Sequence, residues 1–199
     1  MASSGVDVRP LTGEARQAAL PALAGLRLTV FHDWPYLYEG TRAYEERYIA
    51  KFAAAEDAII VGAFDGDTLV GAATGSPLRG HADEFAAPLI DAGHDPERVF
   101  YCGESVLLPA YRGRGIGHAF FDHREGFART LKRFTHAAFC GVIRPDDHPR
   151  KPPEYRPLDA FWHKRGYAKA EGIIGSFAWR DQGDAEESTK PMQFWMKRL

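Results

Sequence analysis

Three glycines at alternate positions, interleaved with arginines, form the stretch of the sequence best suited to chemistry. It reads Arg112-Gly-Arg-Gly-Ile-Gly117, and a helical pattern follows directly from His118. Glycines leave backbone N–H groups uncovered, and several such groups at a helix N-terminus can converge on one anion, where the helix dipole adds roughly half a positive charge. The guanidinium groups of Arg112 and Arg114 suit phosphate oxygens. The stretch therefore predicts a pyrophosphate site.

Two common phosphate motifs do not fit this stretch. Its spacing is Gly-x-Gly-x-Gly, whereas dinucleotide sites use Gly-x-Gly-x-x-Gly, and no acidic residue fits the ribose role. The Gly-Lys-Ser/Thr of a P-loop is also missing from it. A glycine-rich turn that only packs tightly is the alternative, but two arginines serve no packing need in such a turn.

One carboxylate, Glu104, interrupts the apolar run over 99–108 that leads into the turn. A charged group in an apolar strand costs free energy unless a partner compensates it. Glu104 is therefore a candidate for a chemical role, and the alternative is a structural carboxylate that is hydrogen-bonded within the sheet or faces solvent.

Strands and helices that alternate along the chain must position these residues. Apolar β-type runs predict strands at 6–11, 58–64, 68–75, 101–108, 137–143, 173–179 and 192–196. Apolar side chains at helical spacing predict helices at 14–31, 44–52, 83–91, 117–134 and 158–165. Asp65-Gly66-Asp67 is a hairpin signal, and Pro21 predicts either a kink in the first helix or its true start. This order indicates an α/β or α+β mixed sheet with at least one parallel pair.

Two motifs together resemble the GNAT superfamily of N-acetyltransferases. Arg112-x-x-Gly115-x-Gly117 is similar to its Arg/Gln-x-x-Gly-x-Gly/Ala signature, and residues 106–111 are similar to the end of its fourth strand. Residues 160–167, Ala-Phe-Trp-His-Lys-Arg-Gly-Tyr, resemble its Ala-x-x-Tyr-x-x-x-Gly-Phe segment. The detailed resemblance covers about 99–168, and the order of elements extends it to most of the chain.

The resemblance implies a single domain over 1–199 with a GNAT-like acyl-CoA N-acyltransferase fold. In that fold a central, mostly antiparallel sheet is flanked by helices, and its parallel strand 4/strand 5 pair splays apart around the pantetheine of the cosubstrate. Here those strands would be 101–108 and 137–143. The resemblance further implies acetyl-CoA as cosubstrate, no metal, and cofactor contacts from Val106, Leu107, Leu108, Arg112, Gly113, Arg114, Gly115, Ile116, Gly117 and His118.

The implied reaction is transfer of an acetyl group from acetyl-CoA to a primary amine of a small molecule or peptide, by direct attack in a ternary complex. Glu104 lies eight residues before Arg112, where many similar proteins carry a strand-four glutamate. A free alkyl amine has a pKa of about 10.4, so a base is useful at neutral pH. We therefore expect Glu104 to act as the catalytic base, directly or through water.

The usual general acid of the family is missing, because Trp162 stands where the family carries a tyrosine. An indole N–H cannot donate a proton to sulfur. Tyr155, His163 and Tyr167 are the candidate acids, but a thiol with a pKa of about 8.5 can leave as a thiolate, so we expect no essential acid. The missing tyrosine also favours one alternative, a non-catalytic acyl-CoA-binding regulatory module. A transferase of a longer acyl group is another.

The segment 31–39 is rich in aromatic rings and carries Asp33 and Glu39. In the family this connection often borders the acceptor pocket, and rings with carboxylates suit an amine. Packing of the rings over the sheet is the alternative. The histidines beside aspartates, His32, His123 and His148, lack the spacing of metal ligands.

The bulk composition narrows the class of partners. The formal charge of −2 and the pI near 6.4 give no general attraction for nucleic acid or for anionic membranes. No secretory signal and no bilayer-spanning run is visible, so we expect a cytoplasmic protein. Cys102 and Cys140 lie in apolar runs and are expected to be buried free thiols. Exposed C-terminal strands often pair in similar proteins, which would give a homodimer.

Overall fold

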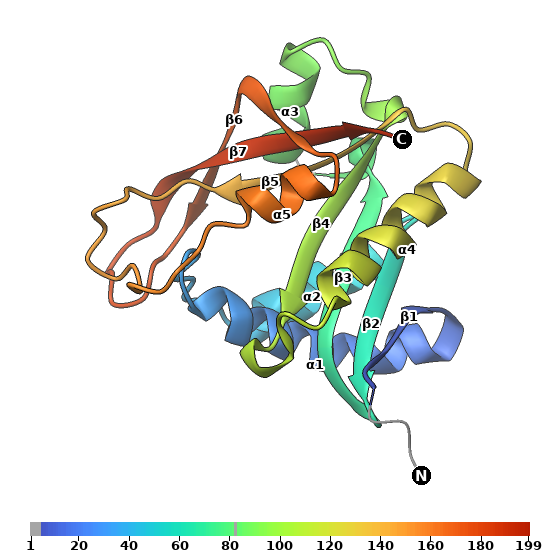
Figure 1. Ribbon diagram of the computed structural model, residues 1–199, viewed down its shortest axis with the longest axis horizontal. Coiled ribbons are helices and arrows are strands. Elements are labelled where there is room, and N and C mark those ends of the chain that lie inside the picture. The colour runs from blue at the N-terminus through green and yellow to red at the C-terminus, as the bar shows by residue number, and fades with distance from the viewer. Residues whose placement is uncertain (1–4, 82) are drawn as a thin grey trace. The chain divides into compact units, whose positions relative to one another are not determined.

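The computed structural model describes residues 5–81 and 83–199, which form two compact units (Figure 1). The first unit consists of Met1–Val30, Gly40–Ser76 and Cys102–Lys132, as far as these are described. The second consists of Phe31–Glu39, Pro77–Tyr101 and Arg133–Leu199, likewise. The prediction of a single domain over 1–199 stays a prediction.

Three antiparallel strands and the helices around them make up most of the first unit. Its elements are β1 (Asp7–Leu11), α1 (Gly13–His32, whose last two residues belong to the second unit), α2 (Arg42–Ala53), β2 (Ile59–Asp65), β3 (Thr68–Pro77), the later part of β4 (Val99–Leu107), a 3-10 turn (Pro109–Tyr111) and α4 (Ile116–Thr130). The predicted hairpin is confirmed, since Asp65 pairs with Thr68 across it. Because α1 begins at Gly13, Pro21 lies inside the helix and does not mark its start.

The ends of two helices in this unit follow from local chemistry. The Thr41 hydroxyl accepts a hydrogen bond from the Tyr44 amide at 3.3 Å and so caps the start of α2. Helix α4 ends at Thr130, four residues before the predicted 134, because Lys132 has φ of 54°. That left-handed conformation cannot continue a right-handed helix.

The second unit combines three strands with α3 and α5. Its elements are the 3-10 turns Leu78–Gly80 and Pro96–Arg98, α3 (Asp83–Asp91), the first three residues of β4, β5 (His136–Val142), α5 (Asp159–Lys164), β6 (Ala168–Trp179) and β7 (Ser188–Arg198). Its core includes Leu89, Tyr101, Cys140, Met192 and Phe194. Strands β6 and β7 run further than the predicted 173–179 and 192–196, because their antiparallel pairing continues into exposed residues that carry no apolar signal.

The seven strands follow the hydrogen-bonding order β1-β2-β3-β4-β5-β7-β6. Strands β4 and β5 are parallel and pair through Val99–His136, Phe100–Ala137 and Tyr101–Ala138, whereas β1–β2, β2–β3, β5–β7 and β6–β7 are antiparallel. The predicted mixed sheet with one parallel pair is confirmed. Both cysteines are buried and take part in no disulfide among the described residues, as expected.

Candidate functional site

The turn between β4 and α4 has the backbone geometry that the glycine pattern predicts. Gly113 and Gly115 have φ of 76° and 82°, in the left-handed region that side-chain-bearing residues rarely adopt. Gly115 is the N-cap of α4, and its carbonyl accepts from the amides of His118 at 2.9 Å and Ala119 at 3.2 Å. The amides of Ile116 and Gly117 therefore precede the first internal bonds of the helix. They are suited to an anion.

The two arginines of the turn are exposed and tied back to it by backbone carbonyls. Arg112 Nε donates to the Leu107 carbonyl at 3.3 Å, and Arg114 Nη2 donates to the Ala110 carbonyl at 2.9 Å. The Arg114 guanidinium also lies 5.1 Å from the centre of the Tyr111 ring. Each guanidinium keeps further N–H groups for another acceptor, because one carries five.

The predicted contacts on β4 differ in exposure. The Val106 side chain is fully buried, so only its backbone can face a ligand. Leu107 and Leu108 are half-buried, and the Leu108 amide donates to Val70 of β3 at 3.0 Å. Ile116 is buried, while Gly117 and His118 are half-buried at the start of α4.

Glu104 is buried in the first unit and has a cationic partner. Its Oε2 lies 2.7 Å from Nη1 of Arg27 on α1, and the same guanidinium donates from Nε to Oε2 of Glu45 on α2. The side chain of Glu104 is 4% exposed, that of Glu45 0% and that of Arg27 10%. Burial lowers the pKa of Arg27, but Glu104, Tyr48 and Glu45 outweigh it and raise that pKa above its ordinary value. Arg27 therefore stays charged between two carboxylates.

Two further residues fix the backbone of Glu104. Its amide donates to Oγ1 of Thr74 at 3.2 Å, and its carbonyl accepts from Nη1 of Arg124 at 3.2 Å. Arg124 is 1% exposed and also donates to the carbonyls of Thr74 and Phe120. The backbone and the carboxylate of Glu104 are thus held by residues from α1, β3 and α4.

Four residues around Glu104 were not predicted from the sequence, namely Arg27, Glu45, Thr74 and Arg124. A signal existed for two of them. Glu45 precedes Ile49 and Phe52 at helical spacing on the buried stripe of α2, and Arg124 follows Phe120 by four on that of α4. A charged residue on an apolar helical stripe needs a buried partner, and Glu104 was the matching anomaly on a strand.

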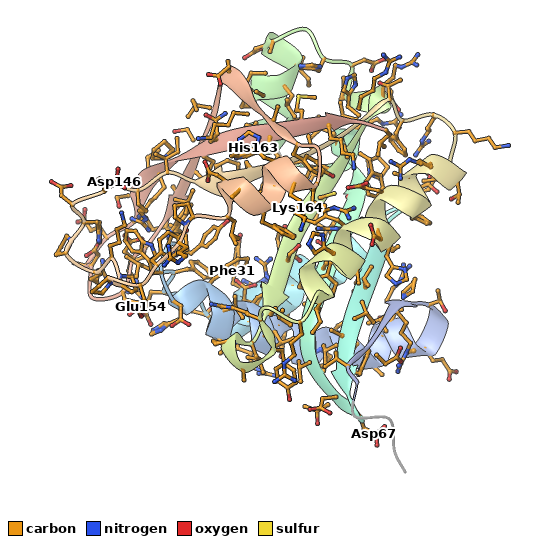
Figure 2. All side chains as sticks on the ribbon, in the orientation of Figure 1. Phe31, Asp67, Asp146, Glu154, His163 and Lys164 are labelled. Atoms are coloured by element: carbon orange, nitrogen blue, oxygen red, sulfur yellow. The ribbon has the colours of Figure 1, made fainter. Side chains whose placement is uncertain are left out.

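The residues considered as proton donors lie in the second unit. Trp162 is half-buried, with its ring centre 5.0 Å from those of Phe139 and Trp195. Tyr167 is 1% exposed, and His163, labelled in Figure 2, is exposed on α5. Burial, with a smaller contribution from Asp159, raises the pKa of Tyr155, which makes this phenol a weaker acid. That no acid is essential stays a prediction.

The segment 31–39, whose first residue Phe31 is labelled in Figure 2, is anchored within the second unit. Arg144 donates to the carbonyls of Pro35 at 2.8 Å and Tyr36 at 2.6 Å, and pairs with both carboxylate oxygens of Asp181 at 2.7 and 2.9 Å. Lys190 lies 3.2 Å from the same carboxylate. Asp33 is exposed and Glu39 half-buried.

The described residues contain neither a metal-binding cluster nor a membrane-spanning helix. Within residues 5–81 and 83–199, no cluster of three or more His, Cys, Asp or Glu side chains is arranged to hold a metal ion. Of the helices in the same residues, none has both the length and the apolarity needed to cross a bilayer.

Solved structures with the same fold come from several bacteria. A ribosomal-protein-alanine N-acetyltransferase from Brucella melitensis is 14% identical, with a TM-score of 0.61 over 97% of this chain and 99% of its own. The yncA protein of Salmonella typhimurium, solved with its cofactor acetyl-CoA, is 12% identical, with a TM-score of 0.62 over 98% and 94%. A GNAT-family acetyltransferase from Streptococcus pneumoniae is 12% identical, with a TM-score of 0.58 over 98% and 100%. The TM-scores show a shared fold, and at identities of 12–14% they show the fold alone.

At the level of sequence, a search of curated proteins found no match. The sequence model of the Acetyltransferase (GNAT) family matches residues 26–151, which include Glu104 and the whole glycine-rich turn. That match covers more than half of the chain and agrees with the fold. The chain therefore belongs to the GNAT family of acetyltransferases.

Proposed function

We propose that this protein is an N-acetyltransferase that moves an acetyl group from acetyl-CoA to a primary amine of a small molecule or peptide. The observation that carries the proposal is the turn from Arg112 to Gly117, with two exposed arginines and two left-handed glycines, of which Gly115 is the N-cap of α4. This geometry suits the pyrophosphate of CoA, which carries the charge that backbone amides and guanidinium groups bind best. The acetyl-CoA in the Salmonella typhimurium neighbour supports the same cosubstrate here.

The reaction proceeds by direct attack in a ternary complex. The amine nitrogen forms a bond to the thioester carbonyl carbon, the carbon–sulfur bond breaks, and CoA leaves as a thiolate. The proton that the nitrogen gives up passes to Glu104, directly or through water, and then to the thiolate or to solvent. Glu104 is supported in this role because it is a buried carboxylate on β4, in the unit that also contains the turn.

The segment 31–39 is our proposal for part of the acceptor surface, with Asp33 and Glu39 as the anionic groups. Its anchoring through Arg144 and Asp181 supports this role, because a segment that is already fixed loses less conformational entropy when a ligand binds.

The test measures CoA release from acetyl-CoA with a panel of amines, amino acids and peptides, for the wild type and Glu104→Gln. We expect turnover with at least one primary amine and a loss of about 100-fold or more in kcat/KM for Glu104→Gln, the lower range of general-base catalysis. Acetyl-CoA binding should stay unchanged in the variant.

Three other results would change the proposed function or its mechanism. Tight CoA binding without turnover on any acceptor would identify an acyl-CoA-binding regulatory module. Turnover with a longer acyl-CoA but not with acetyl-CoA would correct the acyl group. Full activity of Glu104→Gln across the pH range would remove Glu104 from the mechanism and leave it as a structural carboxylate.

A further inference from the structure

Glu104 belongs to a buried cluster of two carboxylates around one guanidinium. Arg27 contacts Oε2 of Glu104 at 2.7 Å through Nη1 and Oε2 of Glu45 through Nε. The guanidinium also lies 4.4 Å from the centre of the Tyr48 ring. Burial raises the pKa of Tyr48, and the nearby Glu104 raises it further, so the phenol of Tyr48 stays neutral. The cluster therefore places two carboxyl groups around one guanidinium inside the first unit.

The two oxygens of the Glu104 carboxylate are not equivalent. Oε2 is bound by Arg27, whereas Oε1 is buried and accepts no hydrogen bond from the residues that the structure describes. Oε1 of Glu45 is buried in the same way. A buried acceptor without a donor is unfavourable, and it gains most when a ligand or a water brings an N–H or O–H group to it.

We propose that Arg27 and Glu45 are positioning residues for Glu104: Arg27 holds Oε2, Glu45 shares the guanidinium, and Oε1 is left to accept the proton of the attacking amine. This inference rests on the proposed function. As the C–N bond forms, the nitrogen gives up one proton, which reaches Oε1 directly or through water and makes Glu104 neutral, and Arg27 keeps its own proton throughout. The carboxylic acid then returns the proton to the CoA thiolate or to solvent.

Arg27 and Glu45 act on the Glu104 carboxylate in opposite electrostatic senses. A guanidinium within contact distance favours the charged carboxylate, which weakens it as a base, whereas a second carboxylate and burial favour the neutral acid. Among the described residues, the charged and titratable groups that the structure places around Glu104 include Arg27 on α1, Glu45 and Tyr48 on α2, and Arg124 on α4, which contacts its carbonyl. Because Arg27 divides its N–H groups between two carboxylates, it stabilises the charge of each one less than it would stabilise a single partner.

This arrangement predicts opposite shifts for two conservative changes. Relative to the wild type, Arg27→Gln removes the cation and should move the titration of Glu104 to higher pH, whereas Glu45→Gln removes the competing anion and should move it to lower pH. Below the pKa of the base, kcat/KM falls tenfold per unit of upward shift, so Arg27→Gln should lose about tenfold or more there. Arg27→Lys should restore most of the loss, since it keeps the charge.

The experiment measures the Glu104 carboxyl pKa by carbon-13 NMR titration, with Glu104→Gln to assign the signal, and the pH profile of kcat/KM in parallel. The controls lie on the exposed face of α2. Arg47→Gln removes a positive charge, as Arg27→Gln does, and Glu46→Gln removes a negative charge, as Glu45→Gln does. Because Arg27→Gln leaves two buried carboxylates without a cation, Arg27→Gln/Glu45→Gln is measured as well. It removes one charge of each sign.

The two readouts separate failure of the inference from failure of the proposed function. NMR shifts in opposite directions, together with matching shifts of the rate profile, support the inference. An NMR pKa that Arg27→Gln, Glu45→Gln and the double variant leave unchanged would overturn it, whatever the activity. Opposite NMR shifts in a protein without turnover would retain the electrostatic arrangement and refute the proposed function.

Discussion

Gly115 is the residue at which the predicted CoA contact depends most directly on backbone conformation. Its φ is 82°, and a β-carbon added there would meet no atom within 4 Å. Space therefore does not prevent an alanine; only the left-handed conformation does, at a cost of roughly 1–2 kcal/mol. The same turn exposes the first amides of α4, so a shift that relieves the strain also moves the groups expected to hold the pyrophosphate.

We expect Gly115→Ala to weaken acetyl-CoA binding by about 5- to 30-fold, the equivalent of roughly 1–2 kcal/mol. Gly126→Ala is the matched control, because Gly126 lies inside the same helix with equally open space around it. There an alanine should stabilise the helix and leave binding unchanged. Calorimetric titration measures both, and equal affinities for the two variants would contradict a pyrophosphate contact at this turn.

At the scale of elements, the buried carboxylate of Asp181, in the loop after β6, connects Arg144, which anchors the segment 31–39, with Lys190 of β7. Asp181 pairs with Arg144 and Lys190, whose side chains are 9% and 4% exposed, and Arg144 donates to the carbonyls of Pro35 and Tyr36. Asp181→Asn would leave two buried cations without their anion, which typically costs about 3–5 kcal/mol.

We therefore expect Asp181→Asn to lower Tm by roughly 6–20 °C, as about 2–4 °C per kcal/mol applies to a chain of this size. If 31–39 borders the acceptor, the variant should also raise the acceptor KM and leave that for acetyl-CoA unchanged. Asp184→Asn, at an exposed position three residues on, is the control. An unchanged Tm for Asp181→Asn would show that the network contributes no net stability.

At the scale of the whole molecule, the free energy of unfolding should decrease in two separate steps as the pH falls. Burial lowers the pKa of His81 to about 4, next to Tyr101 and Phe85 with ring centres at 4.7 and 5.6 Å. The unfolded chain therefore binds this proton first, and stability declines as pH falls from about 6.5 to 4. For Asp181, burial raises the pKa, but Arg144 and Lys190 outweigh it and the pKa is lowered. Its contribution is lost below about pH 4.

Denaturant unfolding at pH 7.5, 5.5 and 4.5 tests the first step. We expect the free energy of unfolding to fall by on the order of 2 kcal/mol over this range through His81, and His81→Phe to abolish that part of the decline. His163→Phe, a change of an exposed histidine, should leave the slope as in the wild type. An identical slope in His81→Phe would assign the decline to other groups.

Particular residues show how much of the fold and of the site could be predicted from the sequence. The hairpin at Asp65–Thr68 and the start of α4 after Gly115 follow from turn chemistry that acts within a few residues. The lengths of β6 and β7 did not follow, because strand pairing extends them over exposed polar residues. The end of α4 was also missed, since Lys132 adopts a conformation that its residue type does not signal.

The family, the mixed sheet and the glycine-rich turn could be predicted from the sequence, because they follow from local motifs and from the order of elements along the chain. The surroundings of Glu104 could not be predicted in this way. Arg27, Glu45 and Arg124 are 77, 59 and 20 residues away from it in the sequence, and they meet it only when α1, α2 and α4 fold onto the sheet of the first unit. Buried charges find partners by proximity in space, which no local pattern encodes.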